Sequence, residues 1–111
     1  MKPRFALAAC ALIVSVLPST AVVAADPAAG KAKVSGMCAV CHGVDGIAKV
    51  PDAPHLAGEN AEYIIRQLQA FKAGTRQHEQ MSIIAQGLSD DDMANIAAWY
   101  ASLKITVQMP Q

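Results

Sequence analysis

The chain has 111 residues, which is enough for one small domain, and its nine Lys and Arg side chains balance nine Asp and Glu side chains. No basic cluster is present, so the composition argues against a nucleic-acid-binding protein. The sequence also lacks an uninterrupted apolar stretch of the about 20 residues that a membrane-spanning helix needs.

Residues 1–25 have the pattern of a secretory signal peptide. Two cations precede an apolar run over residues 6–17, and small residues at 23–25 offer a cleavage site. We expect cleavage to leave a mature domain of residues 26–111 in an exported protein. Cleavage would remove two of the nine cations and none of the acids, so the mature side chains would carry a net charge of −2.

The most informative motif is Cys38-Ala-Val-Cys41-His42. If residues 29–40 are helical, the two thiols stand at positions i and i+3 on one face and can reach the same planar group. Each thiol can add across a vinyl group of haem to form a thioether. The imidazole of His42 then falls against the iron as the proximal ligand, so the motif predicts covalent haem attachment.

Three other interpretations of the motif fit the sequence less well. A thioredoxin-like redox pair requires a preceding strand, and nothing before Cys38 has a strand pattern. A zinc site would need His55 and His78, but 22 residues separate them, and His55 is better explained as a surface loop residue. A structural disulfide suits an exported protein but leaves His42 without a role.

Helix signals follow in chain order. Asp26 as N-cap and Pro27 in the first turn predict a helix that leads into the motif. Residues 43–58 contain five glycines and prolines and are expected to form a loop. A second helix, with an apolar stripe at helical spacing, should begin after Asn60 and end at Gly74.

The last third of the chain predicts a short helical turn over residues 82–86 and a longer helix after Ser89. Three successive acids follow Ser89, where the helix dipole favours negative charge, and Ser89 with Asp92 matches a capping box. This helix should continue to Leu103, and residues 105–111 are expected to form a loose tail.

No segment has a convincing strand pattern, so we expect an all-α domain. A mature chain of 86 residues buries only a modest core, and burial at this size barely offsets the entropy of ordering the chain. A covalently held macrocycle would supply the missing centre. The expected fold is therefore three main helices packed around one covalently attached haem.

The sequence resembles the class I c-type cytochromes, and in particular small bacterial periplasmic monohaem proteins and single halves of the tandem dihaem cytochromes c. The resemblance covers about residues 30–103 and is carried by five segments, which are residues 38–43, residues 54–58, residues 63–74 followed by Arg76, Met81, and residues 88–90 leading into 97–100. It implies a cytochrome c-like fold, one covalent haem c and a location in the bacterial periplasm.

The resemblance also implies roles for individual residues. The carbonyl of Pro54 would accept the Nδ1–H of His42, and Leu56 would pack on the haem. Gly30 and Val34 would cross the last helix at Ile96 and Trp99. One departure is visible, because the four residues between Arg76 and Met81 lack the proline often found ahead of the distal ligand.

The distal ligand is predicted to be Met81, whose thioether would favour the reduced iron. Met81 follows the motif histidine by 39 residues and can reach the far face of the ring. Met37 adjoins the motif on the proximal side, Met93 belongs to a helix stripe, and Met109 lies in the tail. His78, or a vacant or water-filled position, is the alternative.

A six-coordinate iron with His42 and Met81 as ligands has no open position for a substrate, and we find no acid–base pair or nucleophile elsewhere. We therefore expect a one-electron carrier and not an enzyme. One alternative is a cytochrome subunit of a periplasmic dehydrogenase. Another is a haem-based gas sensor, which would require that Met81 does not bind iron.

The expected partners are redox proteins that dock briefly at an exposed haem edge. Residues 39–44 and 81–84 are expected to surround this edge, and they are mainly small or apolar. The acids cluster at residues 90–92, where the last helix already uses them. We therefore expect an uncharged contact and a weak dependence of the docking rate on salt.

Overall fold

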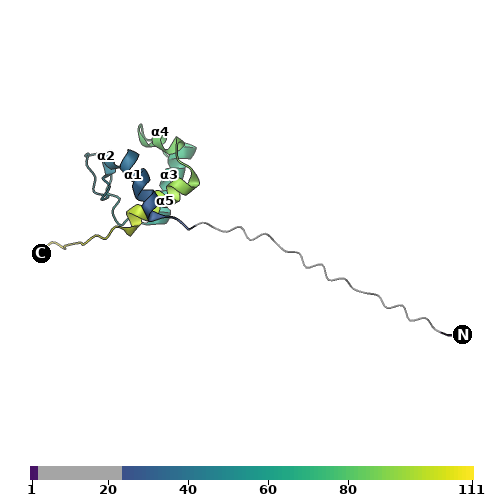
Figure 1. Cartoon of the computed structure of the whole chain (residues 1–111). Coiled ribbons are helices and arrows are strands. Elements are labelled where there is room, and N and C mark those ends of the chain that lie inside the picture. Colours follow the sequence, from purple (N-terminus) through teal and green to yellow (C-terminus); the bar gives the residue numbers. More distant parts are fainter. Residues whose placement is uncertain (3–23) are drawn as a thin grey trace.

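The computed structural model of the chain describes residues 1–2 and 24–111. The expected signal peptide, residues 1–25, lies almost entirely outside the described residues. The described part contains helices and loops but no strand, which confirms the predicted all-α class. Figure 1 labels the helices, which are α1 (Pro27–Met37), α2 (Ala39–His42), α3 (Ala61–Ala73), α4 (Met81–Gln86) and α5 (Asp90–Ser102).

The first predicted helix is present but is divided in two at Cys38. Asp26 caps α1 by accepting the Ala28 N–H at 2.8 Å, as its position in the sequence indicated. Cys38 keeps helical dihedral angles, and its carbonyl accepts the His42 N–H at 2.9 Å. The interruption is therefore slight, and the i, i+3 spacing of the two thiols is kept. Gly43, with φ of 75°, ends α2.

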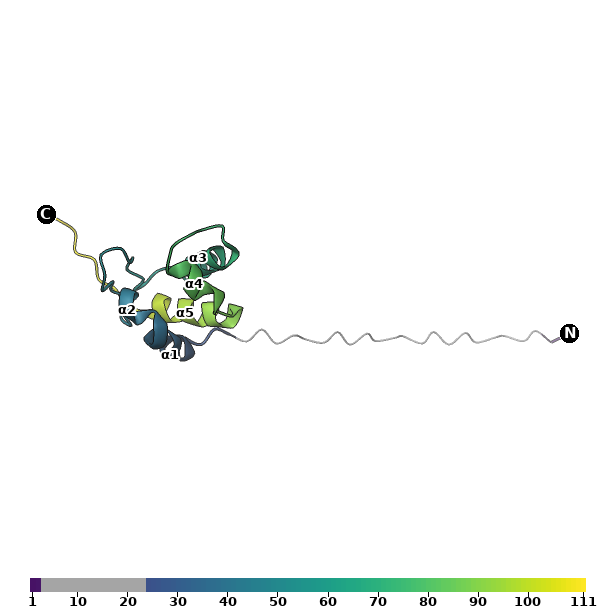
Figure 2. The same ribbon diagram turned by 90° about the horizontal axis from the view of Figure 1, so that it is seen from above.

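Helices α1 and α5 cross closely, and this crossing makes the most extensive helix–helix contact in the domain. Figure 2 shows the two helices side by side. A Cβ atom at Gly30 would collide with the backbone of Asn95, so the crossing requires glycine at this position. Asn95 also accepts the Asp26 N–H at 2.7 Å through its side chain, which ties the start of α1 to α5.

Helix α3 forms where its sequence signals predict. Asn60 accepts the Tyr63 N–H at 3.0 Å as N-cap, and Gly74 ends the helix in the left-handed conformation with φ of 78°. One face of α3 is apolar and buries Ile64, Leu68 and Phe71. This face packs against α4 and α5.

The predicted short turn over residues 82–86 is helix α4, which begins one residue earlier. Met81 was expected in an irregular segment, and that expectation is wrong because Met81 is the first residue of α4. The helix can begin there because a side chain from the preceding segment accepts the N–H of Met81. The predicted capping box of α5 is confirmed, with Ser89 and Asp92 each accepting the other's backbone N–H.

A small core joins α1, α3 and α5. Met93 is fully buried in it, as its place in the helix stripe indicated, and Tyr100 and Val34 are fully buried as well. The remaining core residues are Ile64, Leu68, Leu88, Ile96 and Ala97. Leu56, Met81 and Trp99 pack against this cluster from its edges. Several core residues, among them Leu68 and Ile96, also line a cavity beside the core, and this cavity is the candidate site.

Candidate haem-binding site

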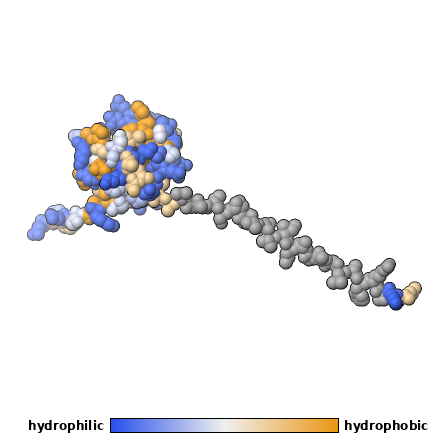
Figure 3. All heavy atoms as spheres, viewed as in Figure 1, coloured by the Kyte–Doolittle hydropathy of each residue, from blue (hydrophilic) through white to orange (hydrophobic). Residues whose placement is uncertain are grey.

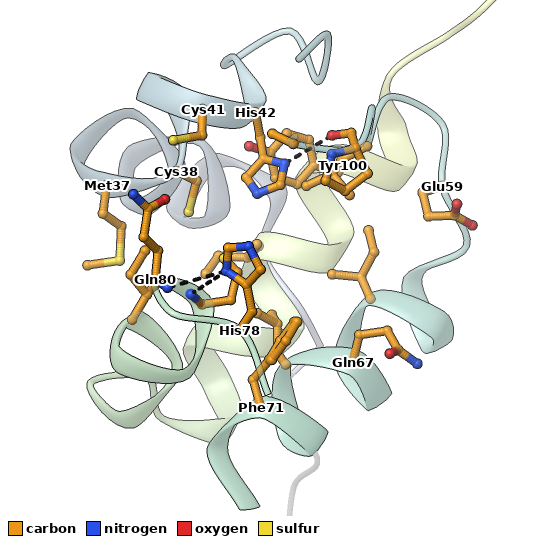
Figure 4. Close-up of a pocket in the computed structure, with 18 of the residues that line it drawn as sticks. Met37, Cys38, Cys41, His42, Glu59, Gln67, Phe71, His78, Gln80 and Tyr100 are labelled. Carbon is orange, nitrogen blue, oxygen red and sulfur yellow. Dashed lines mark hydrogen bonds between the residues drawn. The ribbon is translucent and has the colours of Figure 1, made fainter. Parts of the chain in front are cut away.

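A cavity of about 290 Å³ opens beside the core. All six residues that the sequence assigned to the site line this cavity, and they are Cys38, Cys41, His42, Pro54, Leu56 and Met81. They come from the junction of α1 and α2, from α2, from the loop over residues 43–60, and from the start of α4. Figure 4 shows the cavity with Cys38, Cys41 and His42 on one side of it. Folding thus brings together residues that are spread over 44 positions of the sequence.

The imidazole of His42 is buried and oriented. Only 8% of the residue is exposed, and Nδ1 lies 3.0 Å from the carbonyl oxygen of Pro54. A carbonyl oxygen can only accept, so Nδ1 must carry the hydrogen and donate it. The lone pair is then on Nε2, the atom that remains for a metal ion. Figure 4 shows the ring of His42 directed into the cavity.

The loop that supplies Pro54 is closed on itself. The carbonyl of Gly46 accepts the N–H groups of Leu56 at 2.8 Å and Ala57 at 3.0 Å. Gly46 has φ of 72°, and a Cβ atom there would collide with Ala57. Glycine at position 46 therefore allows the close turn that carries Pro54 to the ring of His42.

The Cys38 thiol lacks the lowered pKa that is typical of a redox-active pair. Both cysteines are free and partly buried. Burial raises the pKa of the Cys38 thiol to about 11, and the nearby Lys33 opposes this only in part. Redox-active thiol pairs instead have lowered pKa values. The zinc alternative also lacks support, since within residues 1–2 and 24–111 no three His, Cys, Asp or Glu side chains are grouped closely enough to hold a metal ion.

Two aromatic side chains of α5 hold the residues that follow His42. The hydroxyl of Tyr100 donates to the carbonyl of Gly43 at 3.0 Å, and the indole Nε1–H of Trp99 donates to the carbonyl of Val44 at 2.8 Å. Burial raises the pKa of Tyr100 above its ordinary value, so the hydroxyl stays protonated and remains a donor. The sequence analysis missed both roles. The signal was available, because a largely buried Tyr or Trp needs a partner for its polar atom.

Of the other candidate ligands, His78 differs from His42 in the atom that carries its proton. His78 lines the cavity, and Figure 4 shows its ring facing that of His42. Its Nδ1 accepts the N–H groups of Gln80 and Met81, each at 3.3 Å. An accepting Nδ1 places the hydrogen on Nε2, which then has no lone pair for a metal ion.

The other methionines are placed as the sequence indicated. Met93 is buried in the core and Met109 is exposed in the tail. Met37 lines the cavity at the end of α1, and Figure 4 shows it on the same side as the cysteines. Met81 lines the cavity from α4, the helix that follows His78.

These residues fit a covalently bound haem. Two free thiols stand one helical turn apart, an imidazole presents Nε2 to an apolar cavity, and a thioether enters the cavity from a different helix. The model of the cytochrome c family matches residues 27–104, which is nearly all of the described chain. The chain therefore belongs to the cytochrome c family, and its cofactor is haem c, bound covalently with one haem in the domain.

Two relatives illustrate the range of lengths in the family. The chain is 42% identical to cytochrome c4 of Pseudomonas aeruginosa over 93 residues, which cover 84% of this chain and 46% of that protein. It is 44% identical to cytochrome c-554(548) of Halomonas halodenitrificans over 82 residues, which cover 71% of this chain and 98% of that protein.

A solved structure shows the same fold. The crystal structure of reduced recombinant cytochrome c4 from Pseudomonas stutzeri superposes with a TM-score of 0.68 at 40% identity, over 76% of this chain and 48% of that one. The chain thus spans about half the length of these cytochrome c4 relatives and nearly the whole length of the Halomonas protein.

Proposed function

We propose that the protein is a one-electron carrier that uses haem c with His42 and Met81 as iron ligands. The observation that carries this proposal is the pair of thiols beside an imidazole whose Nε2 is free for iron. Bound haem supplies an iron that changes its oxidation state by one electron. The chain supplies fixed ligands on both faces, which leave no open position for a substrate.

Each residue has a separate task in this proposal. Cys38 and Cys41 hold the ring through thioethers, and Pro54 keeps the ring of His42 in the ligating tautomer. Leu56 covers apolar surface of the ring. The two hydrogen bonds that His78 accepts favour Met81 as the distal ligand, because they place the proton of His78 on Nε2.

Covalent attachment is tested on protein made with the export and haem-attachment machinery of a bacterium. The haem should survive extraction with acidified acetone, and the mass of the protein should be higher by one haem. Cys38→Ala and Cys41→Ala should each weaken attachment. A compact wild-type protein with a disulfide between Cys38 and Cys41 and no haem would contradict the proposal.

Electron transfer and gas sensing are separated by a second experiment. A redox titration should follow a one-electron curve, and added carbon monoxide should leave the spectrum of the reduced protein unchanged because Met81 occupies the iron. An immediate change with carbon monoxide would favour a gas-binding module. A subunit of a dehydrogenase complex would pass the same titration and would differ by copurifying with a catalytic partner.

The proposed partners are redox proteins that dock at an uncharged surface near the haem edge. Val40 on α2 and Ile83 on α4 are exposed by 76% and 73%, although both are large and apolar. Met37, Val44 and Ile47 are partly exposed in the segments around the motif. Figure 3 shows apolar and polar residues interspersed on the face that it presents. The exposed apolar side chains support a contact that needs little charge.

The salt dependence of electron transfer tests this contact. Second-order rates with the physiological partner should fall only a few-fold when ionic strength rises from about 0.01 to 0.15 M, over which the Debye length falls from about 30 to 8 Å. A fall of about a hundredfold would show that a charged face controls docking. Val40→Ser and Ile83→Ser should lower the rate at every salt concentration.

We further propose that the chain is exported to the periplasm and cleaved before Asp26. Helix α1 begins at Pro27, directly after this position, so cleavage would leave the domain intact. Among the residues that the structure describes, none of the helices is long and apolar enough to cross a membrane. The mass and N-terminal sequence of the mature protein test the cleavage position.

A further inference from the structure

The segment ahead of α4 is organised by His78. Its Nδ1 accepts two backbone N–H groups, those of Gln80 and Met81. Its own backbone N–H donates to Ser82 Oγ at 3.0 Å, and its carbonyl accepts the Ser82 N–H, also at 3.0 Å. Four hydrogen bonds thus join His78 to the three residues that include and flank Met81.

Helix α4 depends on this imidazole at its first turn. The first N–H groups of a helix have no partner within the helix. Gln80 occupies the N-cap position and forms no side-chain cap, and its dihedral angles are already helical. The ring of His78 instead accepts the N–H of Met81, the first residue of α4, and the N–H of Gln80, and so supplies a cap from outside the helix.

The ring of His78 is itself held in place. It packs edge-on against Phe71, with ring centroids 6.5 Å apart and an interplanar angle of 70°. Phe71 is buried at the end of α3, and the guanidinium of Arg76 lies 4.6 Å from the centre of its ring. Arg76 also donates to Gln67 Oε1 at 2.7 Å. The imidazole therefore connects the start of α4 to the end of α3.

We propose that His78 is a positioning residue for the distal ligand, fixing the backbone of Met81 so that its thioether stays directed at the iron. The ring takes over the restraint that a proline ahead of the ligand would supply and that this sequence lacks between Arg76 and Met81. The inference rests on the proposed ligation of iron by Met81. It adds that the strength of that ligation is set by an acceptor three residues earlier in the chain.

Two substitutions of His78 distinguish the effect of its hydrogen-bond acceptor, Nδ1, from the effect of the packing of its side chain against Phe71. His78→Leu keeps an apolar group against Phe71 and removes Nδ1. His78→Asn keeps an oxygen near the position of Nδ1, as asparagine does at helix N-caps. His55→Leu is the matched control, since His55 is also exposed and its Nδ1 also accepts a backbone N–H, that of Ala48 at 2.9 Å, but in the loop over residues 43–60.

The measurements are made on the exported holoprotein. They are the iron–sulfur charge-transfer absorption of the oxidised form, the affinity of that form for added imidazole, and the reduction potential. His78→Leu should weaken the absorption, lower the potential and raise the affinity for imidazole roughly tenfold, the effect of losing about one net hydrogen bond. His78→Asn should stay within about threefold of the wild type. His55→Leu should leave the iron–sulfur absorption and the imidazole affinity unchanged, because its contact lies in the loop on the side of His42.

Several results would overturn the inference. His78→Leu could leave the absorption and the imidazole affinity unchanged, or His78→Asn could behave like His78→Leu, and in either case the acceptor has no role. Equal effects of His55→Leu would show general loosening of the protein. If His78→Ala removes the distal ligand while Met81→Ala does not, His78 is itself the ligand, and the ligation in the proposed function fails together with this inference. If Met81→Ala removes the distal ligand and the His78 variants have no effect, the proposed function stands and the inference about His78 fails.

Discussion

The two faces of the haem cavity are built in different ways. On the proximal face, His42 is buried and its surroundings are held by residues distant in the sequence, with Tyr100 binding Gly43 and Trp99 binding Val44. On the distal face, the residues from 72 to 80 are all exposed, and Met81 is held by contacts from His78 within the same short segment.

The difference concerns which contacts must break before either proposed ligand, His42 or Met81, could leave the iron. Displacing His42 would disturb the crossing of α1 and α5 and the core beneath it, which are parts of the global fold. Displacing Met81, which packs at the edge of the core, would require only the opening of the exposed segment ahead of α4 and of the first turn of that helix. Segments with few buried contacts open at the lowest free energies. The distal ligand should therefore exchange while the proximal ligand stays bound.

The largest effect on stability is expected at the helix crossing beneath the proximal face. Gly30→Ala places a Cβ atom against the backbone of Asn95 and should lower the free energy of unfolding by about 2–3 kcal/mol. Gly36→Ala is the control in the same helix, because a Cβ atom there meets nothing within 4 Å. It should raise stability by about 0.5–1 kcal/mol. Denaturant unfolding of the holoproteins measures both, and equal signs would contradict the account of the crossing.

Met81→Ala should change the iron more than the fold. The iron–sulfur absorption of the oxidised protein should disappear, the reduction potential should fall, and small ligands should bind the iron. Far-ultraviolet circular dichroism should stay close to that of the wild type. Met37→Ala is the matched control, because Met37 also lines the cavity but lies beside the cysteines. Loss of the absorption in Met37→Ala would contradict the assignment of the distal ligand.

Tyr100→Phe should lower the stability of the protein and leave the iron–sulfur absorption intact, which is the opposite of what is expected for Met81→Ala. The substitution removes one of two donors to the carbonyl of Gly43, which also accepts the Gly46 N–H at 3.2 Å, and should cost about 0.5–1.5 kcal/mol of stability. The iron–sulfur absorption should persist, since the distal face is untouched. Tyr63→Phe on the exposed side of α3 should stay within about 0.5 kcal/mol of the wild type. If Tyr100→Phe lost the iron–sulfur absorption and kept its stability, the conclusion that Tyr100 supports the proximal face and not the distal ligand would be wrong.

The smallest effect is expected from Asp92, which joins α5 to α1 at the edge of the crossing. The Ser89 N–H, and then the 3.0 Å ion pair with Lys33, hold the pKa of Asp92 below its ordinary value. A lowered folded-state pKa gives stability above the unfolded pKa near 4, and this stability is lost as the pH falls through the folded value. Asp92→Asn should lower stability at pH 7 by less than about 1 kcal/mol and flatten the acid limb of the stability curve. Asp91→Asn in the same turn is the control and should lower stability at pH 7 by less than Asp92→Asn does.

Much of this architecture could be predicted from the sequence because its signals are local. The N-caps Asp26, Asn60 and Ser89 and the terminal Gly74 mark helix ends by their own chemistry, and the motif at residues 38–42 carries its chemistry at fixed spacing. The interruption at Cys38 could not be predicted, since its dihedral angles remain helical. The start of α4 was also misplaced, because its cap is a histidine that precedes the N-cap position by two residues.

Among the tertiary contacts of the site, some could be predicted from the sequence and others could not. The bond between His42 and Pro54 followed from the resemblance to a known family. The hydrogen bonds from Trp99 and Tyr100 depend on which face of α5 meets the loop after the motif. The partners are 55 positions apart in the first bond and 57 positions apart in the second. Periodicity shows that such a face is buried but does not show which carbonyl it meets.

The crossing of α1 and α5 also has a consequence for the order of events during biosynthesis. Asp26 and Asn95 are 69 positions apart, so α1 is made first but finds its partner only when nearly the whole chain has emerged. Contacts between such distant segments form late and slow folding. Until then α5 cannot cover the attachment motif at the end of α1, so a haem attached early would be available for the later helices to pack against. Formation of the contact between α1 and α5 is therefore the step that is expected to enclose the cofactor.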